Sequence, residues 1–116
     1  MRVAVYSKKI TKANIPLFKR FAATIERFGW KLVLEQELKN QLVKKGFICN
    51  DADVFTKHED FHHGIDMAFS IGGDGTFLKT VSYIRNSDVP ILGINTGRLG
   101  FLANISDDLF EEALEL

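Results

Sequence analysis

Short β-rich runs alternate with helix-like segments along most of this chain. Residues 2–6 (RVAVY), 31–35 (KLVLE), 66–71 (DMAFSI) and 90–96 (PILGINT) have the apolar, β-branched composition of buried strands. Several segments between them have the composition and end signals of helices. This alternation predicts an α/β fold in which a mostly parallel sheet is flanked by helices.

Four helices are expected between and after these strands. The first lies within 11–30, where apolar residues recur at spacings of three and four and so share one face: Leu17, Phe18, Phe21, Ile25 and Phe28. The second lies within 36–46, and the fourth begins with Ser106 as its cap. The third lies within 76–88 and is expected to gather its apolar residues on one side: Phe77, Leu78, Val81 and Ile84.

Length and composition bound the possible functions. A chain of 116 residues with 46% hydrophobic and 26% charged residues fits one globular α/β domain, residues 1–116. Fifteen basic and fifteen acidic side chains leave no basic excess for nucleic-acid binding. No apolar stretch approaches the ~18 residues of a membrane span. The single Cys49 cannot form an internal disulfide, which fits a cytoplasmic protein, and a buried thiol is its simplest interpretation.

A glycine-rich segment, GGDG, follows the expected strand at 66–71. Gly72, Gly73 and Gly75 precede a helix, so backbone N–H groups and the positive end of the helix dipole can face a phosphate. The segment is no Walker loop, because no G-K-[ST] follows, and Leu78 occupies the place of the third glycine in a dinucleotide fingerprint. A tight strand-to-helix turn is the simpler alternative.

Asp74 lies inside this segment, and its carboxylate is not explained if the segment is only a tight turn. A carboxylate beside a phosphate is repelled unless it has a role that offsets the cost. It can ligate a divalent cation that also holds phosphates, or accept a proton from a hydroxyl that attacks phosphorus. Lys79 follows one helical turn later and can offset the negative charge, although a solvated helix lysine is an equal alternative.

A second glycine-marked segment, GINTGRLGFLA, covers residues 93–103. Both glycine segments leave the carboxyl ends of expected strands, and ligands of parallel sheets bind at that edge. Leu99 and Phe101 offer apolar surface there, and an aromatic ring can stack on a nucleotide base. A buried core position is the commoner role of a phenylalanine.

The segment HEDFH, residues 58–62, satisfies the H-E-x-x-H pattern of zinc metalloproteases. His58 and His62 would bind zinc and Glu59 would act as the base. His63 and Asp66 are the nearest candidates for a third ligand, but neither has a recognised spacing. A solvated polar connection is the simpler interpretation.

The two glycine segments together resemble the NAD kinases. GGDGTFL also resembles a motif of diacylglycerol and sphingosine kinases and, in a close variant, of phosphofructokinases. GINTGRLGFL is more specific to NAD kinases, and neither segment departs from the family pattern. With the opening strand and helix, the resemblance covers nearly the whole chain. A lipid kinase and a non-catalytic nucleotide-binding module are the alternatives.

The resemblance implies phosphorylation of the adenosine ribose 2′-hydroxyl of NAD by ATP, giving NADP, with Mg²⁺ or another divalent cation. It assigns Asp74 as the proton acceptor and assigns no protein residue as a metal ligand. Leu99 and Phe101 would line the adenine pocket. The residues implied to contact the nucleotide are Gly72, Gly73, Asp74, Gly75, Lys79, Leu99 and Phe101.

NAD kinases resemble this chain in their first domain but continue into a second, β-rich domain. That domain supplies an Asn-Glu or Asn-Asp motif and much of the nucleotide site. We therefore expect the 116-residue chain to be a fragment with little or no kinase activity of its own. The complete protein is expected to bind NAD and ATP as a cytoplasmic homo-oligomer.

Overall fold

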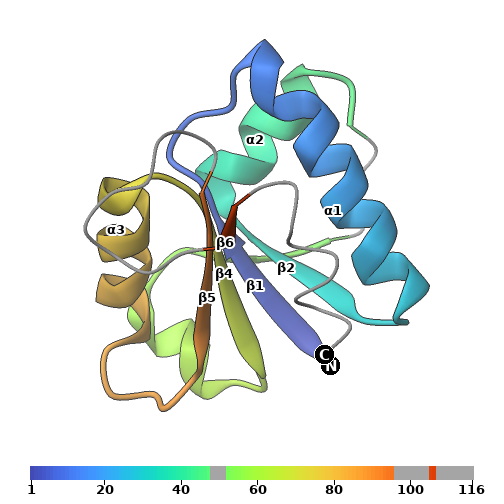
Figure 1. The fold of residues 1–116 in the computed structure, drawn as a ribbon. Coiled ribbons are helices and arrows are strands. Elements are labelled where there is room, and N and C mark those ends of the chain that lie inside the picture. Colours follow the sequence, from blue (N-terminus) through green and yellow to red (C-terminus); the bar gives the residue numbers. More distant parts are fainter. Residues whose placement is uncertain (48–51, 96–104, 107–116) are drawn as a thin grey trace.

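One parallel sheet organises the protein, in a computed structural model that describes residues 1–47, 52–95 and 105–106. Six strands lie in the order β3-β2-β1-β4-β5-β6, and each neighbouring pair is parallel (Figure 1). Their bounds are β1 Arg2–Tyr6, β2 Lys31–Glu35, β3 Asp53–Phe55, β4 Met67–Gly72, β5 Ile91–Asn95 and β6 Ile105–Ser106. The predicted α/β class with a mostly parallel sheet is confirmed.

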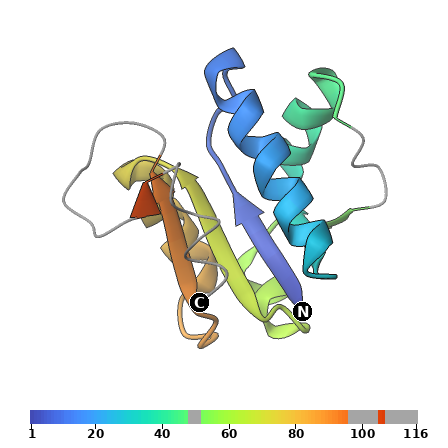
Figure 2. The ribbon, with the colours of Figure 1, turned by 45° about the vertical axis from the view of Figure 1, so that its right-hand side comes forward.

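Helices cover both faces of this sheet. α1 (Ile15–Arg27) and α2 (Gln36–Lys44) lie on one face, and α3 (Asp74–Ile84) lies on the other, as the two views in Figures 1 and 2 show. Two short 3₁₀ helices complete the described elements, η1 (Lys12–Asn14) and η2 (His58–His62). β3 and η2 fall within a polar segment for which the sequence predicted no regular element.

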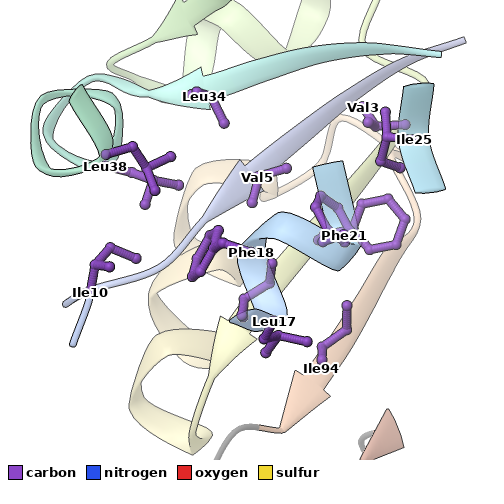
Figure 3. Close-up of a cluster of buried hydrophobic side chains, with 13 residues drawn as sticks. Val3, Val5, Ile10, Leu17, Phe18, Phe21, Ile25, Leu34, Leu38 and Ile94 are labelled. Carbon is purple, nitrogen blue, oxygen red and sulfur yellow. The ribbon is translucent and has the colours of Figure 1, made fainter. Parts of the chain in front are cut away.

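The alternation of side chains along β1 separates two cores. Val3 and Val5 point toward α1 and α2, whereas Ala4 and Tyr6 point toward α3 and η2. Figure 3 shows the larger core, in which the apolar face of α1 packs on the sheet. The Phe21 ring packs edge-on against Phe69 of β4, with 5.1 Å between the ring centroids. The four buried apolar residues of α1 are Leu17, Phe18, Phe21 and Ile25.

Phe28 was predicted to belong to that apolar face, but it is the C-cap residue of α1 and is only half-buried. Its ring contacts Trp30, with 5.0 Å between the centroids. The chain turns away at Gly29, whose φ of 73° lies in the left-handed region that glycine adopts without strain. The helix therefore ends one residue before the last position of the apolar pattern.

The predicted apolar face of α3 is wrong for Leu78 and Val81, although Ile84 is buried as predicted. Leu78 and Val81 are 60% and 42% exposed, and the residues that face the sheet are Thr76, Thr80 and Ile84. Thr80 can be buried because its hydroxyl donates a hydrogen bond of 2.8 Å to the carbonyl of Thr76. The side of α3 that faces the sheet is therefore not its most apolar side.

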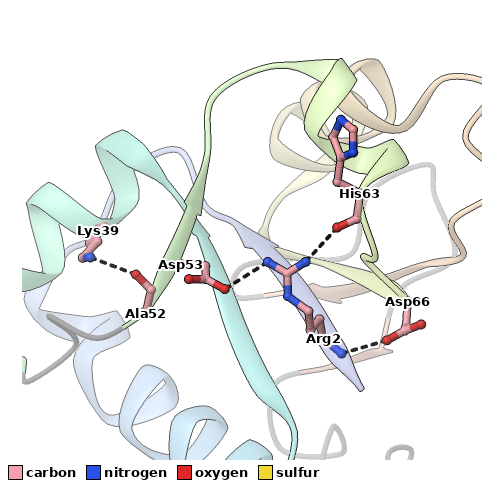
Figure 4. A network of polar contacts seen from close by, with 6 residues as sticks. All are labelled: Arg2, Lys39, Ala52, Asp53, His63 and Asp66. Atoms are coloured by element: carbon pink, nitrogen blue, oxygen red, sulfur yellow. Dashed lines mark hydrogen bonds and ion pairs between the residues drawn. The ribbon is translucent and has the colours of Figure 1, made fainter.

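A polar network joins the amino end of β1 to β3 and to the segment before β4 (Figure 4). Arg2 forms an ion pair of 3.0 Å with Asp53, and its second terminal nitrogen donates to the carbonyl of His63 at 2.7 Å. The backbone N–H of Arg2 donates to the Asp66 carboxylate at 2.8 Å. These contacts hold the amino-terminal edge of the sheet, which is opposite to the edge that carries the glycine segments.

Candidate functional site

The strand order creates a crevice at the carboxyl edge of the sheet. From β1 the chain passes through α1 to β2 on one side, and after β3 it returns to β4 on the other side of β1. In doubly wound sheets ligands bind where the strand order reverses in this way. Tyr6 ends β1 and Gly72 ends β4, so the crevice lies between these two residues. The sequence predicted the edge but not the position, because strand order is not visible in a hydrophobic pattern.

An open cleft of about 580 Å³ lies at this crevice. One wall comes from the end of β1 and the loop after it, and the other comes from the first turns of α3. The cleft is lined by Tyr6, Lys8, Gly75, Leu78, Lys79 and Ser82. The exposed Leu78 therefore supplies apolar surface to a cleft rather than to the core.

Gly72 is required by packing within the protein. A Cβ atom at this position would lie 2.6 Å from Oγ1 of Thr76 and 2.9 Å from its Cβ. Thr76 is buried in the first turn of α3, so it has little freedom to move aside. For Gly72, the interpretation as a tight strand-to-helix turn is sufficient.

Gly73 and Gly75 are different, because packing within the protein does not require them. A Cβ at either position would meet no heavy atom within 4 Å in the described structure. Gly73 is the N-cap residue of α3, and Gly75 lies in the first turn and lines the cleft. N–H groups of a first helical turn have no intrahelical acceptor and carry the positive end of the dipole. The arrangement suits an anionic ligand that approaches the backbone closely.

Asp74 is the first residue of α3 and is half-buried beside Gly75. A carboxylate in the first turn is stabilised by the helix dipole. Within residues 1–47, 52–95 and 105–106, no group of three or more His, Cys, Asp or Glu side chains is placed to hold a metal ion. Mg²⁺ commonly takes one or two carboxylates and completes its shell with substrate phosphates and water. Within the described residues, the chain thus offers one carboxylate here, which suits a Mg²⁺ ion that a ligand's phosphates also hold.

Two lysines bring positive charge to the cleft from opposite walls. Lys79 lines the cleft, and its Nζ lies 5.4 Å from the centroid of the Tyr83 ring, while its predicted role in offsetting phosphate charge stays a prediction. Lys8 was missed, although its position directly after the carboxyl end of β1 was a usable signal. Gln41 of α2 fixes the loop of Lys8, since its amide donates to the Lys8 carbonyl at 3.3 Å and accepts from the Ile10 N–H at 2.8 Å.

Two tyrosines lie beneath the cleft, with 5.7 Å between the ring centroids of Tyr6 and Tyr83. Burial raises the pKa of both hydroxyls above the ordinary value of 10.0, and the negative charge of Glu35 raises them further. Glu35 is itself buried as the N-cap of α2, where its carboxylate accepts the N–H groups of Glu37 and Leu38. Both tyrosines therefore remain neutral at physiological pH.

The second glycine segment begins beside the first. In the register of β4 and β5, Asn95 is the partner of Gly72, so both segments leave the same edge of the sheet as predicted. Leu99 and Phe101 lie outside the described residues, and their predicted contact with adenine stays a prediction. The fourth expected helix also lies outside them, apart from Ser106, which ends β6.

The HEDFH segment does not form a metalloprotease site in the described structure. Residues 58–62 form a 3₁₀ helix rather than the longer helix of such enzymes, and the described residues provide no group of three ligands. His58 lies against the last turn of α3, where its Nδ1 is 2.7 Å from the carbonyl oxygen of Tyr83. His58 is thus half-buried, and the interpretation as a wholly solvated connection is also incomplete.

Comparison with known proteins decides the family. The family model of the ATP-NAD kinase N-terminal domain matches residues 3–116. The chain belongs to the NAD kinase family. It is 36% identical to an NAD kinase of Flavobacterium psychrophilum over 100% of this chain and 40% of that protein. It is 48% identical to an NAD kinase of Bacteroides fragilis over 95% of this chain and 36% of that protein.

A solved structure gives the same result for the fold. The structure of yeast NADH kinase complexed with NADH superimposes with a TM-score of 0.76, covering 98% of this chain and 36% of that one at 19% identity. This NAD kinase chain therefore spans about two fifths of the length of the relatives it matches. This family membership confirms the predicted resemblance to the NAD kinase N-terminal domain. It argues against the lipid-kinase alternative. Of the helices in the described ranges, none is both long and apolar enough to cross a membrane.

Proposed function

We propose that this chain supplies the catalytic base and part of the nucleotide cleft of an enzyme that phosphorylates NAD. ATP would be the donor and the 2′-hydroxyl of the adenosine ribose of NAD would be the acceptor, giving NADP and ADP. The position of Asp74 carries this proposal. It begins α3 between two glycines that packing does not require, beside a cleft at the reversal of strand order.

In the proposed reaction the Asp74 carboxylate accepts the proton of the ribose 2′-hydroxyl. The hydroxyl oxygen forms a bond to the γ-phosphorus of ATP, and the bond from that phosphorus to the oxygen bridging to the β-phosphate breaks. ADP leaves with the electron pair of the broken bond. A positioned base of this kind contributes about 10²–10⁴-fold to the rate, and the rest comes from orientation and charge stabilisation.

The residues around Asp74 support the same proposal. Gly73 and Gly75 allow phosphates to approach the backbone at the positive end of α3. Lys8 and Lys79 offset the negative charge that phosphates bring to the cleft. Mg²⁺ bound to the phosphates would neutralise charge that develops during transfer. Leu99 and Phe101 are proposed to contact adenine, and we infer that the complete protein is a cytoplasmic homo-oligomer.

The proposal is tested by identifying the phosphorylated product. The full-length protein is incubated with Mg²⁺, NAD and ATP labelled at the γ-phosphate, and the product is analysed by ³¹P NMR. We expect a phosphomonoester at the ribose 2′ position and transfer of the label to NADP. A 2′-deoxy analogue of NAD serves as the matched control and should receive no label. Transfer to diacylglycerol but not to NAD, or equal transfer to the 2′-deoxy analogue, would refute the proposal.

A further inference from the structure

Two histidines that the proposed function does not use turn their ring nitrogens toward each other. The Nε2 atoms of His58 and His62 lie 3.2 Å apart, and the two rings are nearly perpendicular, at 83°. His62 is exposed and His58 is half-buried, so an ion can reach the pair from solvent. We propose that His58 and His62 bind a divalent metal ion such as Zn²⁺, Ni²⁺ or Cu²⁺ through their Nε2 atoms.

The hydrogen bond of His58 to Tyr83 prepares it as a ligand. The carbonyl oxygen of Tyr83 only accepts, so the Nδ1 of His58 at 2.7 Å carries the hydrogen. In neutral His58 the lone pair is therefore on Nε2, which faces His62. Metal-ligating histidines are commonly oriented in this way, by an N–H bond from the other ring nitrogen to a carbonyl or carboxylate.

The separation of the two nitrogens matches a shared metal ion. Nitrogen ligands lie about 2.0–2.1 Å from Zn²⁺, so two of them are about 2.9 Å apart at a right angle and about 3.4 Å apart at the tetrahedral angle. The observed 3.2 Å lies between these values. Without metal, the Nε2–H of His62 donates to the Nε2 of His58. To bind a metal ion through Nε2, neutral His62 would carry its hydrogen on Nδ1 instead.

The ligand type selects the metal. Imidazole suits Zn²⁺, Ni²⁺ and Cu²⁺, whereas Mg²⁺ prefers oxygen ligands. The described ranges hold no group of three His, Cys, Asp or Glu residues placed to bind a metal ion, and we propose water for the remaining coordination positions. Asp74 begins α3 and Tyr83 lies in its last turn, about 14 Å away at 1.5 Å per residue. The histidine site is therefore separate from Asp74, the proposed base.

Metal binding at this site would bridge the two ends of η2 and so hold it in the conformation in which His58 contacts Tyr83 of α3. Phe61 of η2 already packs with Phe55 and Tyr83, with 4.9 Å between the ring centroids of the two phenylalanines. An ion that binds only the folded protein stabilises it in proportion to its occupancy. At a free concentration of 100 times Kd, the ratio of folded to unfolded protein rises about 100-fold.

The test uses full-length, tag-free protein from which metal has been removed. Zn²⁺ is titrated by calorimetry, and thermal unfolding is followed with and without Zn²⁺. We expect Zn²⁺ to raise Tm and Mg²⁺ not to do so through this pair. His62→Gln removes an exposed ligand and should weaken Zn²⁺ binding by at least about tenfold. His63→Gln is the matched control, since it changes the exposed neighbour of His62 and should bind as the unmodified protein does.

NMR of the histidine ring nitrogens identifies the ligands directly. Zn²⁺ should shift the Nε2 resonances of His58 and His62 and leave those of His63 unchanged. His58→Gln also loses the contact with Tyr83, so its stability is first measured by unfolding without metal. If His58→Gln is unstable, the Zn²⁺ affinity of His62→Gln alone tests the proposal. The proposal would be overturned if His62→Gln bound Zn²⁺ with the affinity of the unmodified protein. It would also be overturned if His63→Gln lost as much Zn²⁺ affinity as His62→Gln.

Discussion

A side chain at Gly72, the last residue of β4, would collide with Thr76 on the first turn of α3. The distance from a Cβ at Gly72 to the Thr76 Oγ1 would be 2.6 Å. We predict that Gly72→Ala lowers the free energy of unfolding by about 1–3 kcal/mol, as overpacked substitutions do. Urea denaturation of the full-length protein measures this change.

Two variants separate this collision from a general sensitivity of the turn. Gly73→Ala introduces the same methyl group into open space, so it should cost less than Gly72→Ala and only the few tenths to about 1 kcal/mol by which alanine is the poorer N-cap residue. Thr76→Ala in the Gly72→Ala background should recover part of the loss, because the contact with Oγ1 disappears while the contact with Cβ at 2.9 Å remains. Equal losses in Gly72→Ala and Gly73→Ala would contradict the steric explanation.

Gly75 should show opposite effects on stability and on ligand binding. It lies inside α3 with open space around its Cβ position. Because alanine is the better helix former, Gly75→Ala should raise the free energy of unfolding by up to about 1 kcal/mol. The same methyl group projects toward the cleft and should raise KM for NAD. Measurements of unfolding and of steady-state kinetics on the same variant test this prediction. An unchanged KM would show that Gly75 is not part of the proposed phosphate contact.

The two lysines of the cleft are predicted to bind phosphate groups. Lys8→Met and Lys79→Met keep the length of the side chain and remove its charge. Each should weaken nucleotide binding about tenfold or more, because hydrogen bonds to charged groups contribute ~1.5–3 kcal/mol. Lys9→Met is the matched control, since Lys9 is an exposed neighbour that does not line the cleft. If Lys8→Met and Lys9→Met weakened nucleotide binding equally, Lys8 would contribute only through the overall positive charge and not through a phosphate contact in the cleft.

Tyr6 and Tyr83 should make the fold sensitive to alkali. Their pKa values are raised in the folded state by burial and by Glu35. Above pH 10 the unfolded chain loses tyrosine protons that the folded chain still holds, so the unfolded state binds fewer protons. The free energy of unfolding should therefore fall as pH rises from about 10. Absorbance at 295 nm follows the ionisation of the tyrosines. In urea denaturation at pH 9–11, the free energy of unfolding of Tyr6→Phe should fall less with pH than that of the unmodified protein.

Much of the fold was predictable because periodicity and glycine positions act locally. The strands at 2–6 and 31–35 and the placement of α1 within 11–30 follow from short patterns. β3 was not predictable, because three residues with one buried side chain, Phe55, give no periodic signal. The buried side of α3 was predictable only at Ile84, because a hydrophobic pattern does not show that Thr76 and Thr80 face the sheet while Leu78 is exposed.

The parts of the candidate site that lie within one continuous segment of the sequence were predictable. Gly75 of the GGDG segment and Lys79 line the cleft, and Asp74 precedes Gly75 at the start of α3, while the nucleotide contacts of these residues stay predictions. Lys8 was missed because it joins the site only through the reversal of strand order, a relationship between segments distant in sequence. The different roles of Gly72 and Gly75 also required coordinates, because one faces Thr76 and the other faces open space.

The steady-state kinetics of Asp74→Asn in the full-length protein test the central claim most directly. Asparagine keeps the shape of the side chain but cannot accept the proton, so kcat for NADP formation should fall about 10²–10⁴-fold while NAD binding and Tm change little. Asp88→Asn makes the same chemical change at an exposed residue outside the cleft and should retain full activity. A kcat within twofold of the unmodified enzyme in a folded Asp74→Asn protein would contradict the role of Asp74 as the base.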